Sequence, residues 1–302
     1  MSENPSVALP PTGIRRWILA ARPKTLLAAV SPVLLGIAFA IEADAFHLVA
    51  AICALVAAVL IQIGTNLHND YHDFMKGADT EARKGPVRVT QSGLIAPESV
   101  RRAAILTFGL AFLVGLYLVW RGGWPILLIG VASIAFGILY TAGRYSLAYL
   151  GIADFFVLIF FGPVAVAGTV YVQSLELSPL AVLAGFGPGF LSTGILLVNN
   201  IRDIDEDREA GKKTLVVRLG RRFGVRLYAA CIVLACVVVV AAISIAGDHL
   251  AALAALVISP FGLRNAQILY RRTEPSVLNP ILGTTAKLLL IYCILFGIGW
   301  LI

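Results

Sequence analysis

Charged side chains are scarce in this sequence. Asp, Glu, Lys and Arg together make up only 14% of its 302 residues, whereas about 25% is usual for a soluble domain. Hydrophobic residues make up 59%, which exceeds the roughly 45–50% found in soluble proteins. This balance argues against a soluble globular domain and predicts a protein that is embedded in a membrane.

The cysteines and the basic residues lack the patterns that would indicate other classes of protein. All four cysteines lie in apolar runs, without a Cys-x-x-Cys pair or a neighbouring histidine cluster, so they indicate no metal site. The formal net charge is +7, but the Lys and Arg residues are scattered through several loops and form no long basic run. We therefore expect no nucleic-acid partner.

Long apolar runs recur along the chain. A helix needs about 20 apolar residues to cross a bilayer, and the short alternating segments of a β-barrel are missing. The first run is longer than the roughly 7–15 apolar residues of a signal peptide. We expect an all-α polytopic membrane protein, with a flexible tail at 1–14 and a single transmembrane domain at 15–302. Its nine helices are expected near residues 25–42, 47–67, 103–120, 124–141, 149–171, 178–200, 227–246, 250–270 and 284–302.

The basic residues also predict how the chain is oriented. When alternate connections are assigned to opposite sides of the membrane, one side receives nearly all Lys and Arg residues and the other receives only Arg121. Basic loops favour the cytoplasmic side, so we expect a cytoplasmic N-terminus and an external C-terminus. The two long connections, 68–102 and 201–226, both lie on the basic side, where we expect the functional site.

Two polar constellations accompany these connections. Asn66, Asn69, Asp70 and Asp73 stand at i, i+3, i+4 and i+7, which places them on one helical face. In the second constellation Asn199, Asp203 and Asp207 repeat every four residues, whereas Asp205 is turned about 200° away from Asp203. Solvated helix ends would be the plain explanation for either group alone. Two such groups on one side favour a functional cavity, because ionisable groups at membrane depth usually face one.

Paired acidic faces of this kind suit divalent cations that bind a diphosphate. Mg²⁺ prefers a few carboxylates together with phosphate oxygens and water. His68 and His72 stand at i and i+4, but no His-Glu-x-x-His frame supports zinc. The glycine-containing stretches near Gly77 and Gly211 do not match a nucleotide-binding P-loop.

Basic and aromatic residues beside the acidic groups are further candidates. Cationic side chains could neutralise a leaving diphosphate, although each could equally be a residue that follows the positive-inside rule. Lys212 and Lys213 are the strongest of these, and Arg83, Lys84, Arg88 and Arg144 are the others. Aromatic rings could stabilise an allylic cation or simply anchor the chain at the interface, and the candidates are Tyr71, Phe74, Tyr140, Tyr145 and Tyr149.

The motifs resemble those of the UbiA superfamily of intramembrane prenyltransferases. The Asn-Asp-x-x-Asp pattern of that family is matched by Asn69 to Asp73, and its Asp-x-x-x-Asp pattern by Asp203 to Asp207. The segments 21–26, 66–80, 91–95, 198–203 and 211–215 are most similar to the 1,4-dihydroxy-2-naphthoate polyprenyltransferases of menaquinone biosynthesis. Gly77 stands where many members carry a third Asp, and Asp79 is the nearest substitute. Tyr145 to Leu147 departs from the expected Pro-Leu, which leaves acceptor recognition in that loop open.

The resemblance implies a Mg²⁺-dependent enzyme of the bacterial inner membrane. Its central cavity would open to the cytoplasm, and it would join a polyprenyl diphosphate to an aromatic acceptor. The implied catalytic residues are Asp70, Asp73, Asp203, Asp207 and Lys213. The implied substrate-binding residues are Asn66, Asn69, Arg83, Lys84, Arg144, Tyr145, Asn199 and Lys212. The implied metal ligands are Asn69, Asp70, Asp73, Asp79, Asp203 and Asp207.

Other readings stay open at this point. Within the same enzyme class, 4-hydroxybenzoate, homogentisate or haem could replace 1,4-dihydroxy-2-naphthoate as the acceptor, because the motifs lie near the diphosphate. An ion-coupled transporter could also use intramembrane Asp and Asn side chains, and a scaffold subunit without catalysis would need neither motif.

Overall fold

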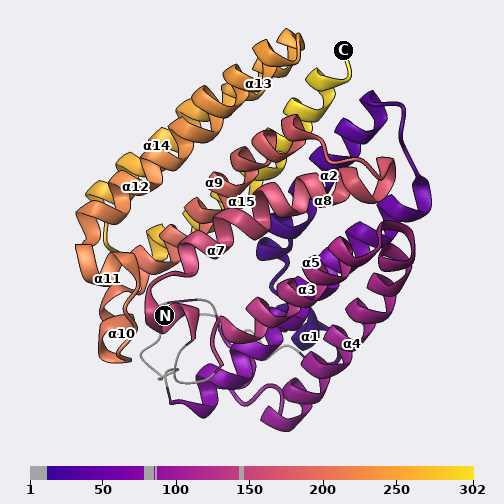
Figure 1. Ribbon diagram of the computed structural model, residues 1–302. Helices are drawn as coiled ribbons and strands as arrows, with labels where there is room; N and C mark the ends of the chain where they lie inside the picture. The colour runs from indigo at the N-terminus through magenta and orange to yellow at the C-terminus, as the bar shows by residue number, and fades with distance from the viewer. Residues whose placement is uncertain (1–11, 78–84, 86, 143–145) are drawn as a thin grey trace, which may run out of the picture.

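The computed structural model describes residues 12–77, 85, 87–142 and 146–302 (Figure 1). Most of the expected N-terminal tail lies outside the described residues, as do five candidate site residues: Asp79, Arg83, Lys84, Arg144 and Tyr145. The regular secondary structure of the described part is entirely helical. The predicted all-α class is therefore confirmed.

The long segments follow the expected apolar runs closely. They are α2 (Pro23–Glu42), α3 (Leu48–Met75), α4 (Pro97–Gly122), α5 (Trp124–Leu139), α7–η1–α8 (Ala153–Ile159, Phe160–Val164, Ala165–Ser174), α9 (Pro179–Arg202), α12–η2–α13 (Arg221–Val233, Leu234–Val239, Val240–Ala246), η3–α14 (Leu250–Ile258, Ser259–Arg271) and α15 (Pro275–Trp300). Short helices connect them: α1 (Ile14–Ala21), α6 (Leu147–Leu150), α10 (Ile204–Glu209) and α11 (Leu215–Leu219).

Eight of the long segments in the described part of the chain are long and apolar enough to cross a bilayer. The ninth expected helix is α5, an apolar helix of 16 residues. At 1.5 Å per residue it is about 24 Å long, somewhat short of a full crossing. The chain is an integral membrane protein.

Two boundaries differ from expectation in a way that matters for the site. Helix α3 continues to Met75, so the first polar constellation lies inside the helix and not beyond its end. The run expected at 149–171 is interrupted between α6 and α7 by Gly151, whose φ is +74°. A side chain at Gly151 would collide with the carbonyl oxygen of Lys213, so this glycine lets the α6–α7 turn pack against the segment after α10.

Helices α9 and α15 lie in the middle of the bundle, between α12–α14 on one flank and α3–α5 on the other (Figure 1). The largest apolar cluster is built mainly from α2, α9, α12 and α15. At the end of α15, Trp300 stacks on Phe39 of α2 with ring centroids 4.2 Å apart. Helices α2 and α15 therefore pack firmly together away from the polar constellations.

The fifth membrane-spanning segment, α7–η1–α8, is kinked at η1, and this kink helps to form an internal cavity. Gly162 has φ −121° and ψ −112°, and Pro163 follows it, so the helix cannot continue regularly through this point. Gly185 of α9 packs against the kink, since a Cβ there would lie 2.6 Å from the Cα of Pro163. Small residues allow this close approach of two helices. The kink places Phe160 and Val164 toward an internal cavity.

The two ends of the bundle differ in their polar groups. The C-terminal ends of α3 and α9 lie at one end, where Arg16 of α1 donates a hydrogen bond to the carbonyl of Leu94 (3.2 Å). The C-terminal end of α15 lies at the opposite end (Figure 1). Arg121 lies there too, and its guanidinium caps α8 through the carbonyls of Val172 (2.6 Å) and Gln173 (2.9 Å).

Candidate functional site

The first polar constellation is buried along one face of α3, as the spacing predicted. Asn66, Asn69, Asp70 and Asp73 are each at most 7% exposed. Four buried polar side chains within two helical turns need partners, because an unpaired buried polar group costs free energy. Their partners come from three other segments of the chain.

Asn66 holds the junction between α1 and α2. Its amide nitrogen donates to the carbonyl of Ala21 and to the hydroxyl of Thr25, both at 2.9 Å, and its amide oxygen accepts from Gln62 (3.2 Å). Between Ala21 and Thr25 the backbone passes through Arg22 in a left-handed conformation, with φ +52°. Substrate binding by Asn66 stays a prediction; in the structure its polar atoms are engaged within the protein, on either side of Arg22.

Asp70 and Asn69 organise the neighbouring segments. The carboxylate of Asp70 accepts backbone N–H groups of Val89 (3.3 Å) and Thr90 (3.1 Å), and it lies 3.8 Å from the guanidinium of Arg22. The amide oxygen of Asn69 accepts from the hydroxyl of Thr141 (2.7 Å). These contacts tie α3 to the turn before α4 and to the end of α5.

Asp73 is paired with Arg88 from the connection to α4. Oδ2 of Asp73 lies 2.6 Å from the Arg88 guanidinium, which also donates to the backbone carbonyl of Asn69 (3.1 Å). The other carboxylate oxygen, Oδ1, is buried and has no hydrogen-bond partner among the residues that the structure describes. One oxygen of Asp73 is thus available to a ligand.

The second constellation spans the junction of α9 and α10. Arg202 binds both carboxylate oxygens of Asp203 at 2.6 Å, and it also donates to Asn199 (2.7 Å) and Asn279 (3.0 Å). Asp203 and Asp207 are both buried, although the helix is interrupted at Asp203. Asp205 is exposed and pairs with Arg208 at 3.3 Å. Asp205 points away from the site, as the helical geometry predicted.

Asp207 and Lys212 form a close ion pair that faces both constellations. Oδ1 of Asp207 lies 3.0 Å from Nζ of Lys212. Burial raises the pKa of the Asp207 carboxyl, and Lys212 offsets only part of that rise. Burial alone would lower the pKa of the Lys212 ammonium, but the charges of Asp207 and Asp73 outweigh it, so this pKa is raised. Lys212 therefore stays positively charged at neutral pH.

The second constellation lines a small charged pocket of about 50 Å³. Its walls come from the α1–α2 junction, the connection after α3, and the α9–α10 region. They consist of Arg22, Arg88, Asn199, Asp203, Glu206, Asp207, Ala210 and Lys212. Arg88 links this pocket to Asp73, and Arg22 links it to Asp70. That the two acidic faces serve one site stays a prediction, which these two arginine contacts support.

The oxygen donors at this pocket fit Mg²⁺ that is shared with a phosphate group. The pocket is lined by the carboxylates of Asp203, Glu206 and Asp207. Asp73 does not line it but pairs with Arg88, which does, and the unpartnered Oδ1 of Asp73 is a buried oxygen of the kind that Mg²⁺ binds. Within the described residues, no three His, Cys, Asp or Glu side chains converge as a metal site. The protein thus offers single carboxylates from separate helices and not a closed cage. Such a set needs phosphate oxygens and water to complete the coordination of the metal.

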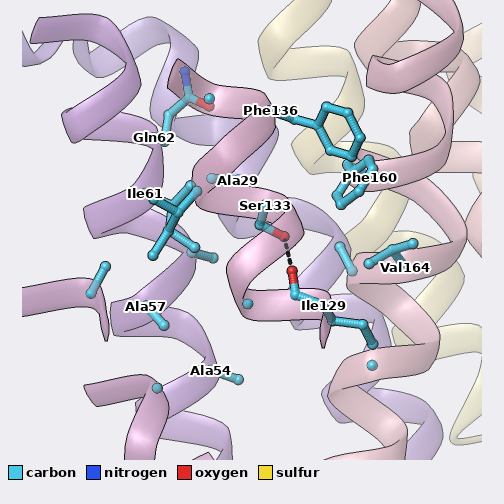
Figure 2. A pocket seen from close by; sticks show the side chains of 18 of the residues that line it. Ala29, Ala54, Ala57, Ile61, Gln62, Ile129, Ser133, Phe136, Phe160 and Val164 are labelled. Atoms are coloured by element: carbon cyan, nitrogen blue, oxygen red, sulfur yellow. Dashed lines mark hydrogen bonds between the residues drawn. The ribbon is translucent and has the colours of Figure 1, made fainter. Parts of the chain in front are cut away.

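A larger, apolar cavity of about 240 Å³ lies within the bundle. Figure 2 shows Ala54, Ala57 and Ile61 of α3 on one side of α5, and Phe160 and Val164 on the other. Phe136 of α5 and Phe160 contact each other with ring centroids 4.9 Å apart.

Two hydroxyl groups in the cavity wall are turned to their own helices. That of Ser133 donates to the carbonyl of Ile129 (2.7 Å, dashed in Figure 2), and that of Thr169 donates to Ala165 (2.7 Å). The cavity suits a hydrocarbon chain.

The end of α5 joins the cavity to the charged region. Tyr140 lines the cavity, and the charges of Asp73 and Asp207 act on its phenol. The next residue, Thr141, binds Asn69, and its carbonyl accepts a hydrogen bond from Lys76 (2.5 Å). Lys76 also lies over the ring of Tyr149, 4.6 Å from its centroid. An elongated molecule with a charged head and an apolar tail would fit this arrangement.

The structure separates the candidate residues into groups. Lys212 lines the pocket, whereas Lys213 is exposed. Two arginines at the site were not among the expected site residues: Arg22, which lines the pocket, and Arg202, which binds Asp203. Arg22 precedes Pro23 in a segment that was noted only for its resemblance, and Arg202 adjoins Asp203. Basic residues flanking conspicuous motifs were the available signal, but positive-inside residues produce the same pattern.

The sequence is similar to those of known proteins. The profile of the UbiA prenyltransferase family matches residues 29–301. A 1,4-dihydroxy-2-naphthoate octaprenyltransferase of Escherichia coli (strain K12) is 38% identical, over 94% of each chain. A protein of the same name from Haemophilus influenzae is 35% identical, over 96% of each chain.

A solved structure has the same fold. It is a UbiA homolog from Archaeoglobus fulgidus bound to DMAPP and Mg²⁺, which superposes with a TM-score of 0.63 at 16% identity, covering 95% of this chain and 99% of the other. The profile match and the two relatives extend over nearly the whole chain, so this protein belongs to the UbiA prenyltransferase family.

Proposed function

We propose that this protein is a 1,4-dihydroxy-2-naphthoate polyprenyltransferase. It transfers a polyprenyl group from polyprenyl diphosphate to 1,4-dihydroxy-2-naphthoate, releases CO₂ and diphosphate, and forms demethylmenaquinol. The observation that carries this proposal is the similarity to the E. coli protein of that name over 94% of both chains. The presence of both a charged pocket and an apolar cavity in the bundle supports it, because the donor has an anionic head and a hydrocarbon tail.

The charged pocket binds the diphosphate of the donor. Arg22, Arg88 and Lys212 line it, and cations that donate charge-assisted hydrogen bonds are the strongest binders of phosphate oxygens. Mg²⁺ would be held by Asp73, Asp203 and Asp207, with Asn69, Asp70 and Asp79 completing the set that the motifs predict. When bound, the metal supplies Lewis-acid stabilisation of the negative charge on the diphosphate.

The apolar cavity protects the reacting carbon. The C–O bond of the donor breaks with both electrons going to the diphosphate, which leaves an allylic cation. Walls such as Phe136 and Phe160 exclude water from this region, and the ring of Tyr140 offers a face that attracts a cation. The acceptor carbon that bears the carboxylate supplies the electron pair of the new C–C bond. Loss of CO₂ returns an electron pair to the ring, so no proton has to leave that carbon.

We also propose that the end with the charged pocket faces the cytoplasm of a bacterial inner membrane. The positive-inside rule supports this orientation, since Arg121 is the lone basic residue expected on the opposite side. Single cysteines introduced at Asp205 and at Leu301 would report the two sides through labelling of intact cells with a membrane-impermeant maleimide. We expect labelling of the Leu301→Cys protein alone.

Product analysis tests the activity. Detergent-purified protein is incubated with Mg²⁺, a polyprenyl diphosphate and a panel of aromatic acids, and the products are identified by mass spectrometry. We expect a prenylated, decarboxylated naphthoquinol that disappears on chelation of the metal. A product with 4-hydroxybenzoate or homogentisate alone would contradict the proposed acceptor. Ion flux in proteoliposomes without any prenylated product would point to a transporter.

A further inference from the structure

Three glycines line the apolar cavity without being required for helix packing. They are Gly115 of α4, Gly130 of α5 and Gly168 of α8. A Cβ atom added at Gly115 or Gly130 would have no heavy atom within 4 Å, and at Gly168 the nearest is Cδ1 of Ile129 at 3.9 Å. By contrast, a Cβ at Gly137 would lie 2.5 Å from Oγ1 of Thr65. The missing side chains of the first three glycines therefore leave open space.

The three glycines lie at nearly the same depth in the bundle. Helices α4 and α5 are joined at Gly123, with Gly115 eight residues before it and Gly130 seven residues after it. At 1.5 Å per residue, both lie about 10–12 Å from this turn. Ile129, which approaches Gly168, is the neighbour of Gly130. Three helices thus contribute an open position to one level of the cavity.

This level lies at a defined distance from the charged end. Gly130 precedes Tyr140 by ten residues, which corresponds to about 15 Å along α5. An isoprene unit contributes four carbon–carbon bonds to the chain and extends roughly 4–5 Å, given bonds of about 1.5 Å. About three units therefore fit between Tyr140 and the glycines. The cavity continues beyond them to Leu118 and Ile126, so a longer tail has to pass this level.

We infer that Gly115, Gly130 and Gly168 determine the length of isoprenoid tail that the protein accepts. The inference rests on the proposed function and goes beyond it by assigning chain-length specificity to particular residues. A side chain as large as leucine at this level fills the space through which the fourth and later units pass. A donor of two units ends before this level and is unaffected.

Leucine variants test the inference. Gly168→Leu and Gly130→Leu are compared with Gly109→Leu, a matched control on α4 that is exposed, has no heavy atom within 4 Å of an added Cβ, and does not line the cavity. The measured quantity is kcat/KM for geranyl diphosphate and for octaprenyl diphosphate, with 1,4-dihydroxy-2-naphthoate as the acceptor. We expect the octaprenyl-to-geranyl ratio to fall about tenfold or more in the two cavity variants, and to stay unchanged in the control.

The outcomes separate this inference from the proposed function. An unchanged ratio in both cavity variants, with melting temperatures like that of the wild type, overturns the inference. Wild-type protein that uses neither donor with this acceptor overturns the proposed function instead. If a leucine variant has a lowered melting temperature and is inactive with both donors, the smaller Gly→Val substitution at the same position is measured instead, because it fills part of the same space. A lowered octaprenyl-to-geranyl ratio in that variant supports the inference, and an unchanged ratio overturns it.

Discussion

The carboxylate of Asp73 lies 2.6 Å from the guanidinium of Arg88, and both side chains are buried. Arg88 also lines the charged pocket, so it touches the first acidic motif and faces the second. A buried ion pair adds little net stability, since desolvation of both charges offsets their attraction. We therefore interpret this pair as part of the proposed diphosphate site, in which Arg88 would bind the diphosphate and Asp73 would bind Mg²⁺.

Substitution of Arg88 tests how its charge offsets that of the buried Asp73. Arg88→Ala removes the direct partner of the buried Asp73 carboxylate, and we expect it to lower the free energy of unfolding by about 3–5 kcal/mol. The double variant Arg88→Ala/Asp73→Asn should regain most of that stability, because no uncompensated charge remains, yet stay inactive. Thermal unfolding in detergent and product formation are the two measurements. A double variant as unstable as the single one would show that Arg88 stabilises the fold through other contacts.

Neutralising Asp207 should abolish most of the activity. Asp207 is buried beside Lys212 at the charged pocket, so Asp207→Asn removes a proposed metal ligand and should lower kcat/KM about 10–100-fold or more. Asp205→Asn is the matched control, since Asp205 is exposed in the same short helix. Its surface ion pair is worth about 0–1 kcal/mol, so activity should be close to that of the wild type. Equal activities of the two variants would remove Asp207 from the site.

Replacing Asn66 should act through Arg22. Asn66→Ala removes the hydrogen bonds to the backbone carbonyl of Ala21 and to the side-chain hydroxyl of Thr25, on either side of Arg22, which costs about 1–3 kcal/mol of stability. We expect KM for the polyprenyl diphosphate to rise while KM for the aromatic acceptor stays constant. Thr25→Ala, which removes one of these bonds, should show a smaller change in the same direction. A rise in the acceptor KM alone would instead indicate direct contact between Asn66 and the acceptor.

Substitution of Gly185 in α9 should destabilise the protein, because this glycine packs against the kink at Gly162 and Pro163. A Cβ at Gly185 would lie 2.6 Å from the Cα of Pro163 and 2.7 Å from its nitrogen, and backbone atoms at a helix crossing cannot move aside cheaply. Gly185→Ala should therefore lower the free energy of unfolding by about 1–3 kcal/mol. Gly109→Ala meets open space and should leave the melting temperature unchanged or raise it slightly. Equal melting temperatures of the Gly185→Ala and Gly109→Ala proteins would mean that α9 can move away from the kink at Pro163 without loss of stability.

The helical architecture was readable from the chain because it depends on local pattern. Apolar runs of membrane-spanning length are a property of consecutive residues. Among the residues that the structure describes, eight long segments match the expected crossings, with α5 as a shorter ninth. Proline in the first turn begins α2, α4, α9 and α15, as its fixed φ favours. The interruption at Gly151 was missed, and the close approach of this glycine to the backbone of Lys213 could not be read from neighbouring residues.

The acidic faces were readable for the same reason. Helical spacing alone put Asp70 and Asp73 on one face and turned Asp205 away, and the burial of the first two and the exposure of the third agree. The spacing could not show that Asn66 is engaged with the α1–α2 junction, 41 and 45 residues away along the chain.

The sequence by itself determined the membrane class, the helices and the presence of two acidic motifs, since each follows from the periodicity and composition of neighbouring residues. Only the tertiary structure decided that Arg22 and Arg88 stand between these motifs, that Lys212 faces them while Lys213 does not, and that an apolar cavity begins beside Tyr140. The reason is physical: which cation reaches which carboxylate, and where packed helices leave space, depends on how distant segments cross.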